Sequence, residues 1–187
     1  RLLVVTTPRG RRQIESDDIL GPLFNDNCAI HWADNVQANP GLSELQAEIE
    51  RLRGGAFDAT VAFGGGSAID SAKVLNVALA ESVSDLSLRE MLANPERQPT
   101  IQPWPLYALP TTAGTGSEVT PYSTVWDHEK RKKHSLAGPA VFPRTAIVDP
   151  ALTDEMPNEV TLATGLDAIN QAAESIWNYN MTPVSEG

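Results

Sequence analysis

The stretch that most constrains this fold is "ATVAFGGGSAIDSAKVLNVALA", residues 59–80. It begins as a short apolar run, passes through three glycines and continues with residues that favour a helix. Short apolar runs are typical of strands buried on both faces, as in parallel sheets. A strand joined to a helix by a glycine loop is the repeating unit of α/β folds, so we predict a strand over 59–66 and a helix over 67–80.

The same alternation recurs along the first 150 residues. Apolar or β-branched runs predict further strands at 2–7, 28–33, 105–112 and 145–150. Residues 43–55 carry Leu45, Ile49 and Leu52 at helical spacing, and residues 122–137 have the pattern of a hairpin with a charged turn. We therefore predict an α/β fold with a doubly wound, mostly parallel sheet that ends near Pro150.

After Pro150 the pattern becomes helical, which divides the chain into two parts. We expect an α/β domain over 1–150 and a helical second part over 151–187. The first residue stands just before an apolar strand without an initiator Met, and the last residues are polar. We interpret the sequence as a piece of a longer protein.

Charge and cysteine content exclude several classes of partner. Lys and Arg total 14 against 24 Asp and Glu, and the resulting net charge of −10 argues against nucleic acid and anionic membranes as partners. No run is long and apolar enough to cross a bilayer, and no secretory signal is recognisable. The single cysteine, Cys28, suits a reducing compartment, so we expect a cytoplasmic protein. The oligomeric state stays open, with a homo-oligomer among the alternatives.

Two small-residue loops follow predicted strands. "FGGGSAIDSAK" combines glycines, which let a ligand approach the backbone, with a helix start that offers unpaired N–H groups to a phosphate. It matches neither G-x-G-x-x-G nor the phosphate-loop pattern, so alone it is equally compatible with a structural turn. "PTTAGTGSE" supplies a second loop rich in hydroxyl groups. Because ligands of open α/β sheets bind beyond the carboxyl ends of the strands, the two loops together favour a nucleotide site.

With "GGGSAIDSAK", "PTTAGTGSE", "IVDP" and "TGLDAINQAAES" in this order, the chain resembles the iron-containing (group III) alcohol dehydrogenases over nearly its whole length. The resemblance implies that residues 1–150 are a dinucleotide-binding domain and that residues 151–187 begin an all-helical domain, with a divalent metal, Fe²⁺ or Zn²⁺, in the cleft between the two domains. It also implies interconversion of alcohols and aldehydes with NAD(P). The cofactor-binding residues that it implies are Gly65, Gly66 and Ser67 at the pyrophosphate, Asp70 in the same helix start, Thr111, Thr112 and Ser117 on the ribose and nicotinamide side, and Lys133 from the hairpin.

The same resemblance implies that Asp167 is the first metal ligand. Asp167 and Gln171 stand four residues apart, so they share one face of a helix, which fits half of a metal site or an ordinary solvated face. The family commonly has histidine at the second position, and a neutral glutamine is a poor ligand for Fe²⁺ or Zn²⁺. Two further histidine ligands would lie beyond Gly187. No side chain is an evident general acid, and we interpret Glu118 and Asp127 as structural.

The first strand bears on the choice of coenzyme. The family commonly has an acid after this strand that accepts a hydrogen bond from the adenosine ribose and repels a 2′-phosphate. This sequence has "VVTTPRGRR", with Thr7 in place of the acid. Arg9, Arg11 and Arg12 follow, and a guanidinium binds phosphate through charge-assisted bonds. We therefore predict NADP(H) rather than NAD(H), with a solvated polar loop as the alternative.

Other functions stay open. The glycerol-phosphate dehydrogenases and dehydroquinate synthases share the glycine loop and the metal position, although "PTTAGTGSE" fits the alcohol dehydrogenases better. A metal-free protein that binds a nucleotide is compatible with Gln171. The segment "AAESIWNYNMTPVS" resembles the branch of the family that reduces phosphonoacetaldehyde, but it carries no basic cluster for a phosphonate.

Overall fold

The computed structural model describes residues 1–83, 86–94, 101–179 and 181–182. Its strands are β1 (Leu2–Val5), β2 (Ile30–Ala33), β3 (Ala59–Gly64), β4 (Leu106–Pro110), β5 (Tyr122–Asp127), β6 (Lys132–Ala137) and β7 (Thr145–Ala146). Its α-helices are α1 (Pro8–Ser16), α2 (Leu20–Asn27), α3 (Leu42–Leu52), α4 (Gly66–Ala78), α5 (Leu88–Ala93) and α6 (Asn158–Trp177). Short 3₁₀ turns are η1 (Glu81–Val83), η3 (Ser117–Val119), η4 (Pro139–Val141) and η5 (Pro150–Thr153).

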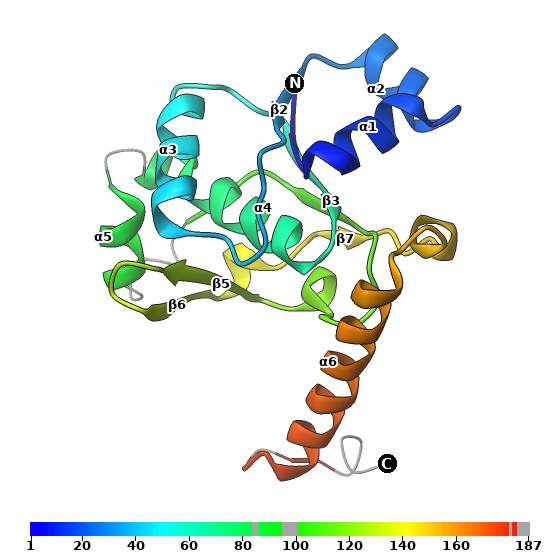
Figure 1. The fold of residues 1–187 in the computed structure, drawn as a ribbon. Coiled ribbons are helices and arrows are strands. Elements are labelled where there is room, and N and C mark those ends of the chain that lie inside the picture. The colour runs from blue at the N-terminus through cyan, green and yellow to red at the C-terminus, as the bar shows by residue number, and fades with distance from the viewer. Residues whose placement is uncertain (84–85, 95–100, 180, 183–187) are drawn as a thin grey trace.

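Five strands form one sheet in the order β2-β1-β3-β4-β7, and all neighbouring pairs are parallel. The pairs Leu2–Ile30 and Val61–Tyr107 illustrate the register. The prediction of a doubly wound, mostly parallel sheet is confirmed. β5 and β6 form the expected antiparallel hairpin, which lies outside the sheet (Figure 1).

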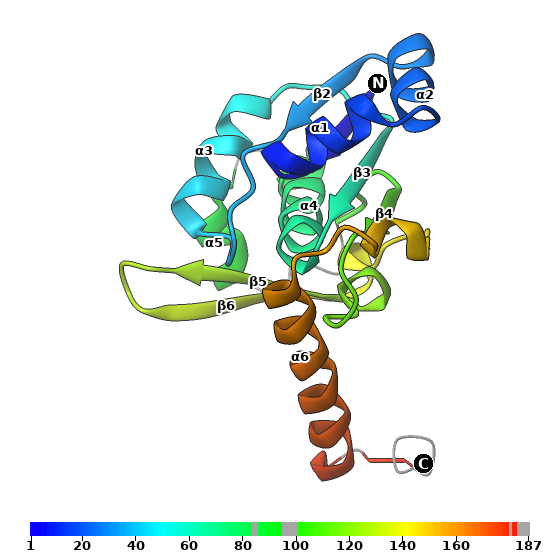
Figure 2. The same cartoon turned by 45° about the vertical axis from the view of Figure 1, so that its right-hand side comes forward.

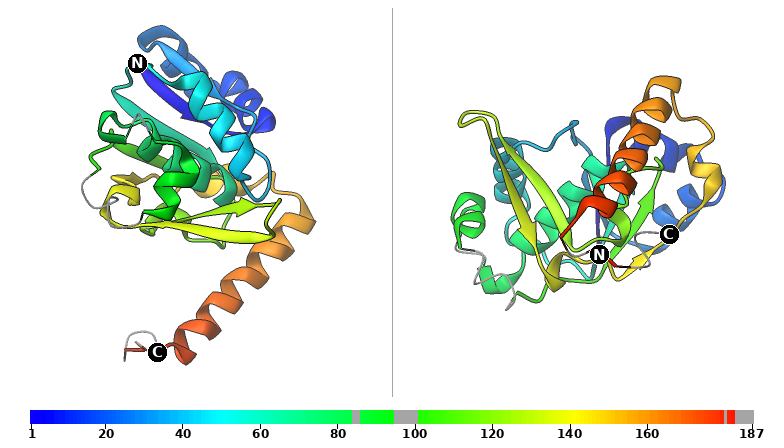
Figure 3. Two further views of the ribbon diagram at one scale, coloured as in Figure 1. Left: turned by 90° about the vertical axis from the view of Figure 1, so that its left-hand side faces the viewer. Right: turned by 90° about the horizontal axis from the view of Figure 1, so that it is seen from below.

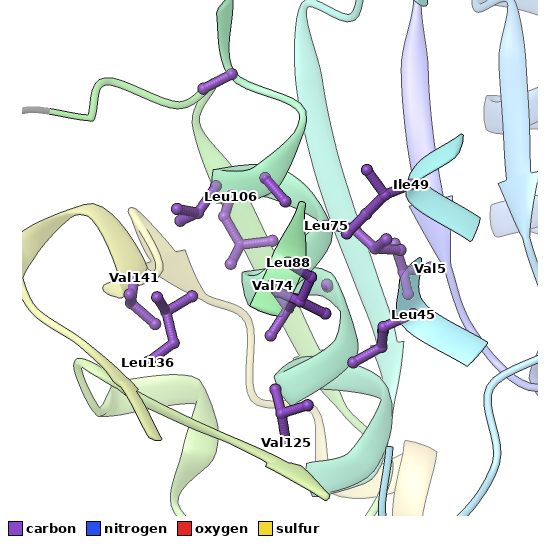
Figure 4. Packing of buried hydrophobic residues seen from close by; sticks show 14 of the residues in the cluster. Val5, Leu45, Ile49, Val74, Leu75, Leu88, Leu106, Val125, Leu136 and Val141 are labelled. Carbon is purple, nitrogen blue, oxygen red and sulfur yellow. The ribbon is translucent and has the colours of Figure 1, made fainter. Parts of the chain in front are cut away.

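Successive residues of a strand point to opposite faces of the sheet. Apolar side chains therefore lie on both faces, and helices cover both. Leu3 and Val5 of β1 belong to the larger core, where Ile49 of α3 and Leu75 of α4 are also buried (Figure 4). Val4 points the other way, into a smaller cluster of buried residues that includes Ile14 of α1. β3, the strand that leads into the glycine loop, is buried in the same way, with Ala62 in the larger core and Val61 and Phe63 in the smaller cluster.

Several element bounds differ from the prediction. β1 ends at Val5, since the Thr6 hydroxyl donates to the Phe63 carbonyl oxygen at 2.7 Å and Thr7 caps α1. β7 has only two sheet residues, although the Ile147 N–H still donates to the Ala108 carbonyl oxygen at 2.8 Å. The helices α1, α2 and α5 were not predicted.

The helical character after Pro150 is confirmed by η5 and by α6, a helix of 20 residues. α6 extends away from the sheet (Figures 1 and 3), and none of its residues is buried. In the part of the chain that the structure describes, no helix has the length and apolar character needed to cross a membrane. The division into domains at residue 150 stays a prediction.

Candidate active site

A cavity of about 800 Å³ lies beyond the carboxyl ends of β1 and β3, and we call it the main cavity. Its walls are formed by the glycine loop with the start of α4, the loop from Thr112 to Thr120, the β5–β6 hairpin, residues 37–40 after β2, Thr7 after β1, and α6. Figure 2 shows how these segments converge below the sheet. The predicted glycine and hydroxyl loops therefore do line one space.

The glycine loop presents the open end of α4 to this cavity. Gly65 is the N-cap residue and provides no side-chain cap. The Ala68 and Ile69 amides donate to the Gly65 carbonyl oxygen at 2.9 and 3.1 Å, which leaves the Gly66 and Ser67 amides at the open end of the helix. A Cβ atom at Gly65 would stand 2.9 Å from Thr112 Oγ1, and one at Gly66 would stand 2.7 Å from Thr115 Cγ2. The absence of side chains here keeps a narrow space between backbone amides and threonines, which suits an anionic group.

Ser67 is held by a segment that the sequence analysis did not single out. Its Oγ accepts a hydrogen bond from the Asn39 N–H at 3.2 Å, and Asn39 has a positive φ of 56°. Asn39 lines the main cavity together with Gln37 and Pro40. An Asn-Pro dipeptide after a strand is a turn signal, and asparagine tolerates the left-handed region, so this segment could have been noticed.

Asp70 and Ser117 line the main cavity, but their polar side-chain atoms bond to each other. The Ser117 hydroxyl donates to Asp70 Oδ1 at 2.6 Å, and the Thr124 N–H donates to Asp70 Oδ2 at 3.0 Å. Burial raises the pKa of the Asp70 carboxyl, and these two hydrogen bonds act in the opposite direction. That these two residues contact the cofactor stays a prediction.

A second space of about 260 Å³, the side pocket, adjoins the main cavity. Thr7, Gly65, Thr112 and Val160 line both spaces, so the two lie next to each other at the glycine loop. Thr111 lines only the side pocket. The Thr7 hydroxyl accepts a hydrogen bond from the Gly10 N–H at 3.0 Å and so belongs to the cap of α1.

The three arginines after β1 have different surroundings. Arg9 is exposed, lines the side pocket and donates to the Glu155 carbonyl oxygen at 3.0 Å. Arg11 is paired with Glu15 at 2.8 Å and with Asp34 at 2.9 Å, and these bonds raise its pKa. Arg12 is exposed and lines neither space. Two carboxylates already hold the guanidinium of Arg11, so Arg9 is the arginine of the three that lines the side pocket without a carboxylate partner in the described residues.

Lys133 of β6 lines the main cavity from the hairpin. Its Nζ lies 4.3 Å from the centroid of the Trp126 ring, a cation–π contact that orients the ammonium group. The Trp126 N–H donates to the Pro40 carbonyl oxygen at 2.9 Å, which ties the hairpin to the loop after β2. Glu118 lies on η3, and Asp127 is paired with Arg89 at 2.7 Å, in agreement with a structural role for Asp127.

Asp167 and Gln171 share one face of α6, as their spacing predicts. Gln171 Nε2 donates to Asp167 Oδ2 at 2.9 Å and reaches the Thr115 carbonyl oxygen at 3.5 Å. Asp167 lines the main cavity and Gln171 does not. A second contact joins α6 to the hydroxyl loop, because a Cβ atom at Gly114 would overlap the Thr164 carbonyl oxygen.

The donor set near Asp167 fits one ligand of a metal, not a whole site. Among the described residues no three His, Cys, Asp or Glu side chains gather closely enough to hold an ion. The histidines lie elsewhere: His31 packs edge-on against Phe57, His128 stacks on Trp126, and His134 Nε2 is 3.9 Å from Asp127. The carboxylate of Asp167 is compatible with Fe²⁺ or Zn²⁺, but one carboxylate does not hold either ion against water.

A protein-family model described as iron-containing alcohol dehydrogenase matches residues 1–150. The chain belongs to this family. The match favours these enzymes over the glycerol-phosphate dehydrogenases and dehydroquinate synthases, which the sequence motifs left as an alternative.

Relatives and solved structures of this family support the assignment. The chain is 41% identical to the phosphonoacetaldehyde reductase of Streptomyces viridochromogenes over 172 residues, which are 90% of this chain and 42% of that protein. An iron-containing alcohol dehydrogenase of Thermotoga maritima matches with a TM-score of 0.86 at 38% identity, over 100% of this chain and 50% of that one. The sulfoacetaldehyde reductase of Bifidobacterium kashiwanohense, solved in complex with NAD⁺, matches with a TM-score of 0.82 at 31% identity, over 98% and 47%. The chain spans half or less of the length of these relatives.

Proposed function

We propose that this chain is the cofactor-binding part of a metal-dependent oxidoreductase that interconverts small aldehydes and alcohols with NAD(P). One observation carries the proposal: the amide-rich start of α4 and the carboxylate of Asp167 line the same cavity. Ser67 in the first turn of α4 and Asp167 in α6 come from distant parts of the sequence, and the proposal assigns the first to phosphate binding and the second to metal binding.

The glycine loop and the two threonine-lined spaces support dinucleotide binding. In this proposal the amides of Gly65, Gly66 and Ser67 hold the pyrophosphate, because a helix start offers unpaired N–H groups and a partial positive charge. Lys133 and Thr112 contact the sugar on the side of the main cavity. The side pocket takes the adenosine end, since it shares Thr7, Gly65 and Thr112 with the main cavity.

Asp167 would hold the divalent ion, Fe²⁺ or Zn²⁺, at the opposite wall of the main cavity. When bound, the metal polarises a carbonyl oxygen and the nicotinamide exchanges hydride with the carbonyl carbon. Gln171 would orient the Asp167 carboxylate by donating to its Oδ2 at 2.9 Å. In this proposal residues 1–150 form the dinucleotide-binding domain, and residues 151–187 begin a helical domain that supplies the other ligands.

We propose NADP(H) as the preferred coenzyme. Thr7 brings no carboxylate to the side pocket, so nothing at that position repels a 2′-phosphate. Arg9 lines the same pocket, and its bond to the Glu155 carbonyl oxygen uses one of five guanidinium donors, which leaves others for a phosphate. The similar sulfoacetaldehyde reductase was solved with NAD⁺, so both coenzymes belong in the test.

For the substrate we propose a small aldehyde such as phosphonoacetaldehyde. The support is the 41% identity to a phosphonoacetaldehyde reductase over 90% of this chain. The segment 172–185 that suggested this branch lies partly outside the described residues. We further propose a cytoplasmic enzyme that acts on small molecules and binds neither nucleic acid nor membranes.

A metal-free nucleotide-binding protein is the second candidate, because Gln171 replaces a histidine and its amide donates to Asp167. The deciding experiment measures metal content and aldehyde reduction with NADPH and NADH in the complete protein. Bound Fe²⁺ or Zn²⁺ with turnover of phosphonoacetaldehyde or acetaldehyde supports the oxidoreductase. Dinucleotide binding without metal and without turnover supports the second candidate.

A further inference from the structure

α4 carries two oppositely charged side chains, Asp70 and Lys73, on the side that faces η3 and the start of β5. Lys73 is 0% exposed, which is rare for a lysine unless its ammonium group is fully paired. The chain therefore places a charge in its interior, directly behind the wall of the main cavity.

The Lys73 ammonium group has an acceptor for each of its three hydrogens. It donates to the Tyr122 carbonyl oxygen at 2.6 Å, to the Thr120 carbonyl oxygen at 2.8 Å and to Ser117 Oγ at 3.1 Å. All three acceptors belong to the segment 117–122, which joins η3 to β5. One side chain thus holds this connection against α4 at three points.

Asp70 holds the same segment one helical turn earlier. Its carboxylate accepts from the Ser117 hydroxyl at 2.6 Å and from the Thr124 N–H at 3.0 Å. The Ser123 hydroxyl also donates to the Asp70 carbonyl oxygen at 3.0 Å. Ser117 is the shared member, since its hydroxyl accepts from Lys73 and donates to Asp70.

The held segment is a wall of the main cavity, to which Ser117, Thr120, Tyr122, Ser123 and Thr124 all contribute. Burial lowers the pKa of Lys73 to about 8, although the negative charges of Asp70 and Glu118 oppose this effect, and burial also raises the pKa of Asp70. Burial therefore disfavours both charges, and the hydrogen bonds to the 117–124 segment and the attraction between Asp70 and Lys73 offset this cost.

We infer that Asp70, Lys73 and Ser117 form a clamp that fixes the 117–124 wall of the main cavity and so strengthens dinucleotide binding. The three residues act by positioning this wall, and Lys73 itself does not line the cavity. The inference rests on the proposed function, because it assigns the main cavity to a dinucleotide.

The test compares Lys73→Met, which keeps the apolar stem but removes the ammonium group, with Lys130→Met on the exposed hairpin turn as the matched control. The dissociation constant of NADPH is measured in the complete protein by fluorescence titration, with kcat at saturating coenzyme and the melting temperature alongside. We expect Lys73→Met to weaken NADPH binding at least about tenfold, while kcat at saturation stays within about twofold and Lys130→Met matches the wild type.

Ser117→Ala keeps the test decisive if Lys73→Met does not fold, because it removes only the shared hydroxyl. Ser117→Ala is expected to weaken NADPH binding, and the double variant to be less affected than the sum of the two single effects. A folded Lys73→Met or Ser117→Ala variant that binds NADPH like the wild type, or strict additivity in the double variant, would overturn the inference. A wild type that binds neither NADPH nor NADH would instead refute the proposed function.

Discussion

Replacing Gly66 by alanine tests the cofactor assignment directly. The added Cβ atom would stand 2.7 Å from Thr115 Cγ2 and 2.9 Å from Thr115 Oγ1. Real Cβ atoms do not approach other atoms so closely, so either the hydroxyl loop moves away or the start of α4 shifts. In both cases the narrow space in front of the first α4 amides changes shape.

The magnitude follows from the bonds that this space allows. A hydrogen bond to a charged group contributes about 1.5–3 kcal/mol. Loss of one amide–phosphate bond therefore predicts a dissociation constant that is roughly 10- to 150-fold higher. Gly66→Val adds two methyl groups at the same point and is expected to abolish binding.

The assay is a calorimetric titration of NADPH and NADP⁺ into the complete protein, with circular dichroism and melting temperature as controls for folding. Gly165→Ala on α6 is the matched control, because its Cβ atom would meet no described atom within 4 Å. Combining Gly66→Ala with Thr115→Ala separates the two causes. If the double variant binds NADPH again, the loss in Gly66→Ala came from the displaced hydroxyl loop. If binding stays lost, the added methyl group itself fills the space in front of the α4 amides.

An unchanged dissociation constant in a folded Gly66→Ala or Gly66→Val variant would refute the reasoning. The pyrophosphate would then have to bind away from the start of α4, and the main cavity would need another occupant.

Three further outcomes are expected. Thr7→Asp should shift the ratio of kcat/KM for NADPH over kcat/KM for NADH toward NADH by about tenfold or more. Arg9→Gln should shift the ratio in the same direction, while the control Arg12→Gln should not. A wild type that prefers NADH contradicts this prediction. The 187-residue chain alone should bind Fe²⁺ or Zn²⁺ weakly and reduce no aldehyde, because Asp167 is its one proposed carboxylate ligand, and rates equal to those of the complete protein would disprove it. Between pH 8 and 10.5 the unfolded state keeps the Lys73 proton that the folded state loses, so the free energy of unfolding should rise with pH by about 3 kcal/mol relative to Lys73→Met. Parallel stability curves would contradict this.

The sequence predicted those elements whose buried side chains form a clear local hydrophobic pattern. β3 and α4 follow from an apolar run and a glycine loop, and α3 follows from leucines and isoleucine at helical spacing. α1 escaped prediction because only Ile14 is a buried apolar side chain and Gly10 interrupts the helical pattern. Gly10 is needed there, since a Cβ atom would overlap Thr6 Oγ1. The Thr7 cap followed by Pro8 was a usable signal.

The shorter helices also left partial signals. α5 begins with a capping box between Ser87 and Glu90, which the sequence pattern contains. α2 includes Gly21 and Pro22, so its sequence resembles a loop. Tertiary contacts determine whether α2 and α5 form, and these contacts cannot be read from a single sequence.

The candidate site was predictable only where a motif is local. The two small-residue loops meet at one sheet edge, as the order of strands and helices predicts. The bond between Asp70 and Ser117 joins residues 47 positions apart, so no local pattern indicates that they bind each other. The same holds for Asn39 and Ser67, which are 28 positions apart.

The close contact between Gly114 and Thr164 joins the backbone of the hydroxyl loop to the backbone of α6, the helix that carries Asp167. Gly114 has a φ of 152°, and its missing side chain lets the loop lie against the carbonyl oxygen of α6. Asp167 lies three residues after Thr164, which is less than one helical turn. The position of Asp167 in the main cavity therefore depends on how closely the backbone of Gly114 packs against α6. A side chain at position 114 would push against the Thr164 carbonyl oxygen and so displace this part of α6, together with Asp167.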